Sequence, residues 1–199
     1  MKNTREISLG LIILLLSISL FSFSQTQFRF QENKGQLPNS VFSKIKVPGG
    51  SVFIEKGKFL YSFYNSKQLQ ERHDLIRNED WIDAHSFSAI FLNSLESSEI
   101  KLSKESDYFE NFYTSEIQVE NVHFYKELEQ KNIYPGIDLK MYSYENNLKY
   151  DLILHPNANS RKIRIKYTGQ DNIYLRNENL IIETSVNTVT ELALFAYQI

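Results

Sequence analysis

Apolar and polar residues alternate in two neighbouring runs near the end of the chain. Residues 137–144 read IDLKMYSY and residues 148–154 read LKYDLIL, with Glu145-Asn146-Asn147 between them. Alternation with period two places successive side chains on opposite faces of a β-strand, and Asn tolerates the left-handed backbone of a tight turn. The pattern predicts an antiparallel hairpin with a loop at 145–147.

The register of this hairpin decides whether three polar side chains can form a site. With a loop at 145–147, Tyr144 and Leu148 face each other across it. Asp151 and His155 then lie on the face opposite to Asp138. The pattern therefore predicts that these three side chains do not converge on one centre.

Similar short runs, rich in aromatic and β-branched residues and separated by Gly, Pro or Asn, follow one another along the chain. The expected strands are 42–47, 52–54, 59–63, 85–93, 99–103, 162–168, 172–176 and 180–184, with up to two more in 188–199. Residues 106–130 are compatible with either a strand or an irregular connection. About ten short strands favour an all-β fold, most simply an antiparallel β-sandwich.

One polar stretch interrupts the strands. Residues 66–83 read SKQLQERHDLIRNEDWID, with apolar side chains at loosely helical spacing. We expect a short helix or a polar excursion here. No internal repeat or linker is visible, so residues 25–199 are expected to form a single domain.

The first residues have the pattern of a secretory signal peptide. Lys2 and Arg5 precede an apolar run, and the small residues Ser22 and Ser24 precede polar Gln25. This pattern predicts cleavage between Ser24 and Gln25 and export to the periplasm, the cell surface or the medium. An uncleaved N-terminal anchor is the alternative. No later run is apolar enough to span a membrane.

The composition excludes several classes of function. The 199 residues contain no cysteine, which removes cysteine nucleophiles, Cys-ligated zinc and thiol redox motifs. The net charge is −2 and the charges are interspersed, so a nucleic-acid patch is not expected. The four histidines lack metal-ligand spacing, and there is no serine-hydrolase elbow or phosphate loop. We therefore expect no cofactor, no metal and no catalytic residues.

The stretch 78–85, NEDWIDAH, is the most enzyme-like feature. Glu79, Asp80 and Asp83 flank Trp81. An indole can stack on a sugar while carboxylates bind hydroxyl groups or transfer protons, so this stretch is a candidate glycan contact. A solvated charged loop anchored by one Trp is the favoured interpretation, because glycosidase carboxylates come from separate strands.

Three stretches together resemble one family. They are FQENKGQLPNSVFSKIKVPGGSVFIEKGKFLYSF, VHFYKELEQKNIYPGIDLKMYSYENNLKYDLILHPNANSRKIRIKYTGQDNIYL and NLIIETSVNTVTELALFAYQI. They are similar to the N-terminal "ENKGQ" domain of large exported surface proteins of Bacteroidetes. In those proteins the domain often precedes β-propeller repeats and a sorting domain for type nine secretion. Its function is unknown, so the resemblance carries over no site residues.

The chain departs from this family at three places. Leu37 stands where relatives usually have Trp, and Leu194 or Phe195 stands where they have Pro. Relatives also continue into further strands beyond the position of Ile199. The resemblance thus implies either a chain truncated at its C-terminus or a domain that closes its sheet differently.

These observations favour a non-enzymatic exported module with a structural or interaction role in the cell envelope. Its expected partner is another envelope protein, or a strand that pairs with an open sheet edge. A carbohydrate-binding or carbohydrate-active protein using Trp81 is one alternative. A gene fragment without an independent role is another.

Overall fold

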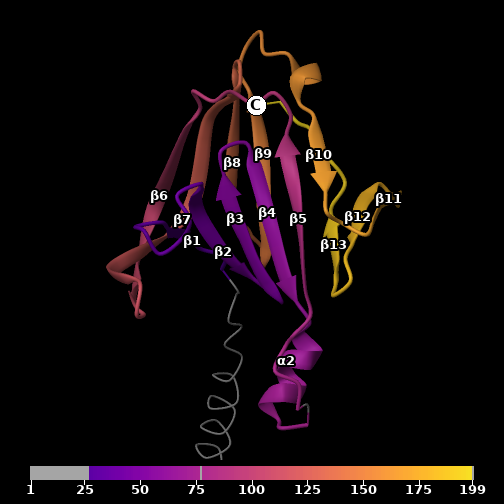
Figure 1. Ribbon diagram of the computed structural model, residues 1–199. Helices are drawn as coiled ribbons and strands as arrows, with labels where there is room; N and C mark the ends of the chain where they lie inside the picture. Colours follow the sequence, from indigo (N-terminus) through magenta and orange to yellow (C-terminus); the bar gives the residue numbers. More distant parts are fainter. Residues whose placement is uncertain (1–26, 77, 199) are drawn as a thin grey trace, which may run out of the picture.

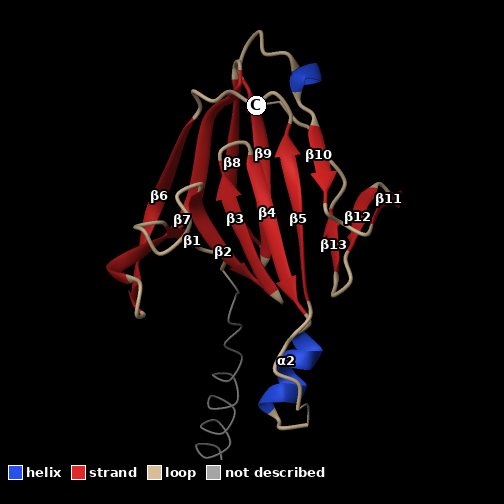
Figure 2. Cartoon of the chain, viewed as in Figure 1, coloured by secondary structure: helices blue, strands red, loops and turns tan. Residues whose placement is uncertain are grey.

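The computed structural model describes residues 27–76 and 78–198. The predicted signal peptide and its cleavage site lie outside these residues. The described chain is built almost entirely from antiparallel strands, with one α-helix near residue 70 (Figures 1 and 2). The expectation of an all-β antiparallel fold with a short helix in 66–83 is confirmed.

A ten-stranded sheet forms most of the molecule, in the order β10-β5-β4-β3-β2-β1-β7-β8-β9, with β6 paired to β7. Its strands are β1 Phe30–Glu32, β2 Val41–Val47, β3 Gly50–Glu55, β4 Lys58–Tyr64, β5 Ala84–Phe91, β6 Glu99–Tyr113, β7 Gln118–Tyr134, β8 Ile137–Tyr144, β9 Asn147–Leu154 and β10 Ile165–Thr168. A second sheet contains β11 Asn172–Arg176, β12 Asn179–Glu183 and β13 Thr188–Glu191.

Tight turns produce the meander from β2 to β4. Pro48-Gly49 joins Val47 to its partner Gly50, and Gly49 has φ +73°. Pro sets the first central position of such a turn, and Gly supplies the positive φ at the second. Lys56-Gly57 makes an equivalent two-residue loop between β3 and β4.

The sheet curls so that its two flanks pack face to face. Figure 1 shows β8 and β9 behind β3 and β4, and the core fills the space between them. Phe59 on β4 contacts Phe91 on β5 and Tyr150 on β9, with ring centroids 5.1 and 5.9 Å apart. One folded sheet therefore supplies both layers of the sandwich-like structure.

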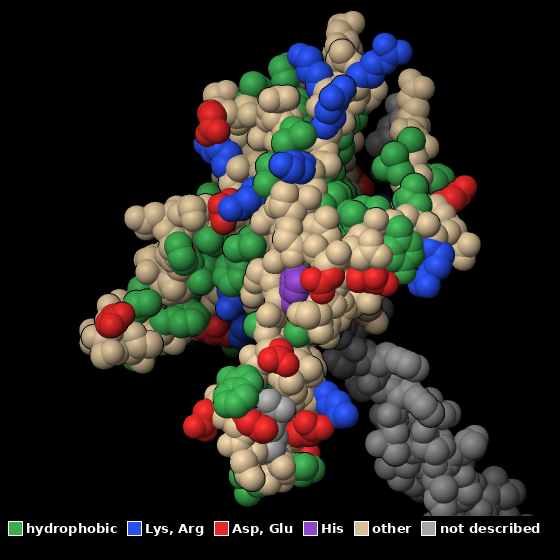
Figure 3. Space-filling view, turned by 45° about the vertical axis from the view of Figure 1, so that its right-hand side comes forward, with side chains coloured by type: hydrophobic (Ala, Val, Ile, Leu, Met, Phe, Trp, Pro, Cys, Tyr) green, Lys and Arg blue, Asp and Glu red, His purple; other side chains and the backbone are tan. Residues whose placement is uncertain are grey.

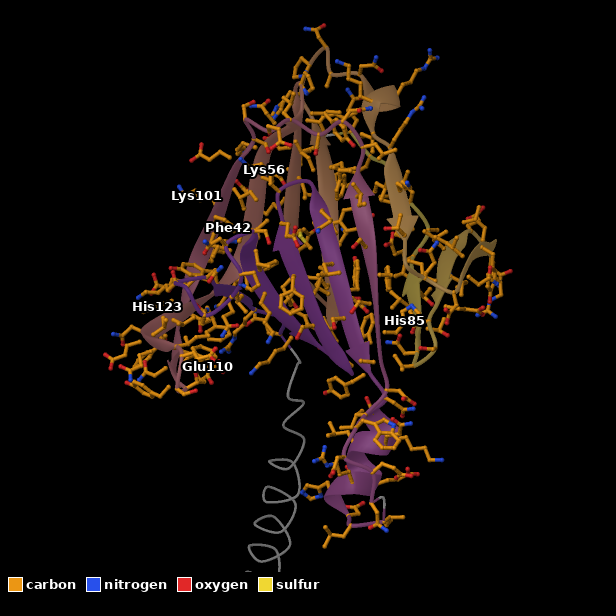
Figure 4. All side chains as sticks on the ribbon, in the orientation of Figure 1. Phe42, Lys56, His85, Lys101, Glu110 and His123 are labelled. Carbon is orange, nitrogen blue, oxygen red and sulfur yellow. The ribbon has the colours of Figure 1, made fainter. Side chains whose placement is uncertain are left out.

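The small sheet covers one end of this core. Ile182 on β12 packs with Phe63 and Phe87 of the large sheet, and all three side chains are buried. His85, at the start of β5, fixes the contact (Figure 4). Its ring nitrogens lie 2.7 Å from the Gly169 carbonyl oxygen and 2.9 Å from Ser185 Oγ.

The segment 66–83, which we call the arm, projects away from the sheet (Figure 1). It contains helix α2, Ser66–His73, whose N-cap Asn65 accepts a hydrogen bond from the Gln68 backbone N–H. No residue of α2 is buried. The helix therefore depends on its caps and on the chain at its two ends, not on burial of an apolar face.

Several strand boundaries differ from the sequence expectation. β6 and β7 extend to 15 and 17 residues, because most of residues 106–130, which were compatible with either a strand or an irregular connection, form strand pairs. β10 begins at Ile165, since Asn159 caps a short 3₁₀ turn over Ser160–Lys162. Up to two further strands were expected in residues 188–199, and the described part, which ends at residue 198, contains one, β13.

The register of the β8–β9 hairpin was predicted wrongly. Tyr144 pairs with Asn147, so the loop is the two residues Glu145 and Asn146, with φ +48° and +62°. Both central residues of a type I′ turn need positive φ. A shift of one residue exchanges the faces of the whole partner strand, so Asp151 and His155 share the face of Asp138.

A substitution at Gly50 tests whether β3 and β4 pair as closely as the structure shows. A Cβ at this position would lie 2.1 Å from the Ser62 carbonyl oxygen and 2.9 Å from Phe63 Cα. We expect Gly50→Ala to lower the free energy of unfolding by about 1–3 kcal/mol, because backbone atoms must move. Urea unfolding measures the change, with Ser51→Ala as the control, expected within about 0.5 kcal/mol of wild type. Equal effects of the two substitutions would contradict the pairing.

Candidate functional site

The predicted glycan contact lies on the arm, where hydrophobic and acidic side chains gather (Figure 3). Trp81 is 63% exposed, and Glu79 and Asp80 are exposed as well. Asp83 is engaged in holding the arm: its carboxylate accepts from Gln68 Nε2 at 2.7 Å, and its N–H donates to Gln68 Oε1 at 2.8 Å. The favoured interpretation of a loop anchored by Trp81 is therefore wrong in one respect, because this ring is largely exposed, while Asp83 holds the arm.

Asp138 and His155 do converge, contrary to the sequence prediction. His155 Nε2 lies 2.9 Å from Asp138 Oδ2, and Lys131 Nζ lies 3.0 Å from the same oxygen. The Asn132 backbone N–H donates to Asp138 Oδ1 at 2.7 Å. Asp151, on β9, lies nearer the hairpin loop than Asp138 does, and its carboxylate accepts a hydrogen bond from Tyr142 Oη at 2.8 Å.

Both carboxylate oxygens of Asp138 are therefore used within the fold. Burial raises the pKa of Asp138, but the hydrogen bonds from Asn132, His155 and Lys131 outweigh it, and the net pKa is lowered. A buried carboxylate with these donors anchors the irregular pairing between β7 and β8 near residues 130–137. We call this cluster of Asp138, His155, Lys131 and Asn132 the Asp138 corner, and its hydrogen bonds indicate a structural role instead of a catalytic one.

A solvent-open groove lies on the outer face of β1, β2 and β7. It has a volume of about 290 Å³ and is lined by Gln27, Arg29, Gln31, Lys44, Lys46, Tyr108, Glu110 and Phe124. A second hollow of about 410 Å³ continues from it past Tyr108 to Glu105, Asp107 and Lys126. Together the two hollows are lined by cations, carboxylates, amides and aromatic rings.

Alternation in β1 and β2 positions one wall of the groove. Gln31 pairs with Lys44 across the two strands, and also with Phe124 of β7. Paired residues share a face, so the cationic and amide groups stand together beside the buried Phe124 ring. Arg29 and Lys46 lie two residues from Gln31 and Lys44, and therefore extend the same face.

Irregularities in β6 position the other wall. The pairing of β6 with β7 shifts between Glu105 and Phe109 and again between Glu110 and Phe112, and Lys104 has φ +58°. Such bulges bend a strand and redirect its side chains. Tyr108 thereby reaches across β7, with its ring centroid 5.1 Å from that of Phe124.

Hydrogen bonds connect the two walls. Glu110 accepts from Gln31 Nε2 at 3.2 Å and from Tyr108 Oη at 2.8 Å, and its carboxylate lies 3.5 Å from Lys46 Nζ. The Arg29 guanidinium lies 5.9 Å from the centre of the Tyr108 ring. Figure 4 shows Glu110 near the lower end of the β6–β7 ribbon, close to His123.

Lys44 differs from a fully exposed lysine in its partial burial and in the charge of its neighbours. Burial lowers its pKa first, and neighbouring Lys46 lowers it further, while Glu110 acts in the opposite direction. The Lys44 ammonium lies 5.6 Å from the Phe53 ring centroid. Within the described part of the chain, no carboxylate lies within 4.0 Å of Lys44 Nζ.

Sequence reasoning missed this groove. A cue was present in Lys44 and Lys46, which alternate with buried residues as Arg29 and Gln31 do. The contribution of Tyr108 and Glu110 depends on bulges that alternation does not reveal. Among the described residues, no group of three or more His, Asp and Glu side chains is placed to hold a metal ion.

Comparison with known families places the chain. A family model described as "Domain of unknown function (DUF7948)" matches residues 30–199. The chain belongs to this family. Most of the groove, the arm and the Asp138 corner lie within the DUF7948 match, while Gln27 and Arg29 precede it. No curated protein and no solved structure matches the chain.

The described residues of this DUF7948 chain include no helix of the length and hydrophobicity needed to cross a membrane.

Proposed function

We propose that this DUF7948 chain is an exported, non-enzymatic module that acts in the cell envelope through structural or interaction surfaces. The proposal rests on the positions of the large apolar side chains that the fold leaves exposed. Leu75 and Ile76 on the arm are 87% and 73% exposed, and Leu194 and Phe195 after β13 are 95% and 81% exposed. Large apolar side chains that lie next to one another in water are typical of interaction sites.

Two further observations support this proposal. The polar groups that looked catalytic in the sequence, Asp83 and Asp138, make hydrogen bonds that hold the fold. The N-terminal pattern of Lys2, Arg5, an apolar run and small residues is typical of an exported precursor. The resemblance to the "ENKGQ" domain adds a context, a module of a large Bacteroidetes surface protein.

The proposed partner is another envelope protein, with strand pairing as one mode of contact. β6 pairs with β7 on one edge, and no described strand pairs with its other edge. An unpaired edge offers backbone N–H and C=O groups to an added strand. The bulges in β6 restrict such pairing to its regular portion near Glu99–Ser103.

Export predicts a defined mature N-terminus. When the full sequence is expressed in a Gram-negative host, we expect the recovered protein to begin at Gln25, because Ser22 and Ser24 suit signal peptidase. Intact-mass measurement identifies the cleavage position. Ser24→Leu is the control, expected to block cleavage because a large side chain does not fit the processing site. An unprocessed wild-type chain retained in the cytoplasm would contradict export.

A carbohydrate-binding protein is the second candidate, and the exposure of Trp81 favours it. An exposed indole next to the carboxyl groups of Glu79 and Asp80 can stack on a sugar ring while the acids accept from its hydroxyl groups.

A glycan array with wild type and Trp81→Ala separates the two candidates. If the arm binds glycans, we expect loss of an aromatic stacking contact to weaken binding about tenfold. Leu75→Ala is the matched control on the same arm, because it removes an exposed apolar group that lacks a π face. If the wild-type chain bound no glycan on the array, the carbohydrate-binding candidate would be excluded and only the interaction module would remain.

A further inference from the structure

The groove of about 290 Å³ on β1, β2 and β7 is lined by more cations than carboxylates, whereas the hollow beyond Tyr108 adds Glu105, Asp107 and Lys126. In the groove itself, the lining contains three cations, Arg29, Lys44 and Lys46, and a single carboxylate, that of Glu110. Glu110 lies 3.5 Å from Lys46 and takes its remaining hydrogen bonds from uncharged Gln31 and Tyr108. The charges of Arg29 and Lys44 are therefore not compensated by a direct ion pair among the described residues.

The position of Lys44 makes this excess informative. A surface lysine extends into water, whereas Lys44 is partly buried and lies over the Phe53 ring. A partly desolvated cation beside a second cation costs free energy, which the nearby Glu110 carboxylate offsets only in part. Functional sites in proteins are often places where such charges are held in a cleft.

We propose that this groove binds the anionic group of a small ligand, a carboxylate or a phosphate monoester attached to a body about the size of one sugar ring. Arg29 offers a planar fork of N–H donors, and Lys44 and Lys46 supply point charges. The exposed amide of Gln27 can bind a neutral hydroxyl group, whereas the Gln31 amide is buried and donates to Glu110. The volume of about 290 Å³ limits the bound portion to roughly one such unit.

Glu110 favours ligands with one anionic group over ligands with two adjacent anionic groups. Its carboxylate faces the groove from β6 while fixing Tyr108 and Gln31 in place. A ligand with a second anionic group next to the first would meet repulsion from Glu110. The proposal goes beyond the proposed function, since the groove can hold an anion whether or not the chain is exported and whether or not the arm binds a partner.

Titration calorimetry with three probes tests the site on protein produced from the full sequence. The probes are glucuronate, glucose 6-phosphate and glucose, which share a ring and differ in charge. We expect both anionic probes to bind, glucose to bind at least tenfold more weakly, and added salt to weaken the anionic probes. The ratio of the two anionic affinities shows whether the groove prefers a carboxylate or a phosphate.

Three groove variants and one control variant assign the binding to the groove. Lys44→Gln and Arg29→Gln should each raise the Kd of the anionic probes about tenfold or more, because each removes a charge-assisted contact. Lys101→Gln is the matched control: it removes one positive charge from the opposite end of β6 (Figure 4) and should leave the Kd unchanged. Glu110→Gln should lower the Kd several-fold. Thermal unfolding of each variant checks that it is folded.

Three results would overturn the proposal. The first is no heat of binding for either anionic probe up to about 10 mM, which corresponds to less than about 3 kcal/mol of binding free energy. The second is equal affinity for glucose and the anions. The third is that Lys101→Gln weakens binding as much as Lys44→Gln does, which would assign the effect to net charge instead of the groove.

Discussion

Replacement of Phe59 by Ala is expected to lower the free energy of unfolding by about 3–5 kcal/mol. Phe59 is 2% exposed and lies where the two flanks of the curled sheet meet. Its ring contacts Phe91 on the neighbouring strand and Tyr150 on the opposite flank. Its removal leaves a cavity between layers that the tightly paired strands cannot easily collapse to fill. Urea unfolding followed by circular dichroism measures the loss.

Phe42→Ala is the matched control. Phe42 belongs to the same large sheet, but its side chain is 37% exposed (Figure 4). We expect a loss of about 1 kcal/mol or less, mainly from strand propensity and partial burial. If the two substitutions had equal effects, the sheet would not curl into two packed layers, because only the curled arrangement distinguishes these two rings so strongly.

The alternation of side chains was sufficient to predict the meander of β2, β3 and β4. Here the turn chemistry is unambiguous, because Pro48-Gly49 and Lys56-Gly57 each place Gly at a position of positive φ. Turn type and strand pattern agree in this part of the chain. Agreement between local and global signals is what makes a register predictable.

Two hairpins show where the same reasoning fails. The loops Glu145-Asn146 and Asn177-Glu178 each contain two residues, both with positive φ. A Glu in the left-handed region is uncommon, so a longer loop ending on Asn was the natural expectation. The strain of one Glu residue is accepted because the shorter loop keeps the apolar face of the following strand towards the core.

This one-residue difference accounts for the error at the Asp138 corner. The loop at 145–147 placed His155 on the wrong face, whereas the observed pairing of Tyr144 with Asn147 brings it to Asp138. The groove was missed for another physical reason. It needs Tyr108 and Glu110 from a strand whose pairing shifts twice, and no period in the sequence marks a bulge.

Glu191 links β9 and β10, the two end strands in the order of the large sheet, and we call this junction the seam. Removal of the Glu191 side chain has the second large expected effect. Tyr167 Oη on β10 lies 2.9 Å from both carboxylate oxygens of Glu191, and Tyr150 Oη on β9 donates at 3.3 Å. One side chain of β13 thus joins two strands that do not pair with each other. Glu191→Ala leaves two largely buried hydroxyl groups without this acceptor, which costs about 1–3 kcal/mol for each.

The same contact predicts a dependence of stability on pH. Burial raises the pKa of Glu191 above its ordinary value of 4.5, although the hydrogen bonds from Tyr167 and Tyr150 partly oppose the rise. Between the unfolded and folded pKa values, the folded chain therefore holds a proton that the unfolded chain has released. The free energy of unfolding decreases as pH rises through this interval, and the contribution is fully present only below the unfolded pKa.

Glu191→Gln isolates that contribution, because Gln keeps the shape and an acceptor oxygen but does not titrate. We expect the variant to lack the Glu191 part of the decrease in stability as the pH rises above 4.5, as measured by urea unfolding at a series of pH values. Glu183→Gln is the control, since Glu183 accepts from Tyr174 Oη at 2.9 Å within the small sheet, away from the seam. If Glu191→Gln and wild type lost stability in parallel across this range, the carboxyl group would be solvated, and the seam would be held by the packing of Tyr150 and Tyr167 alone.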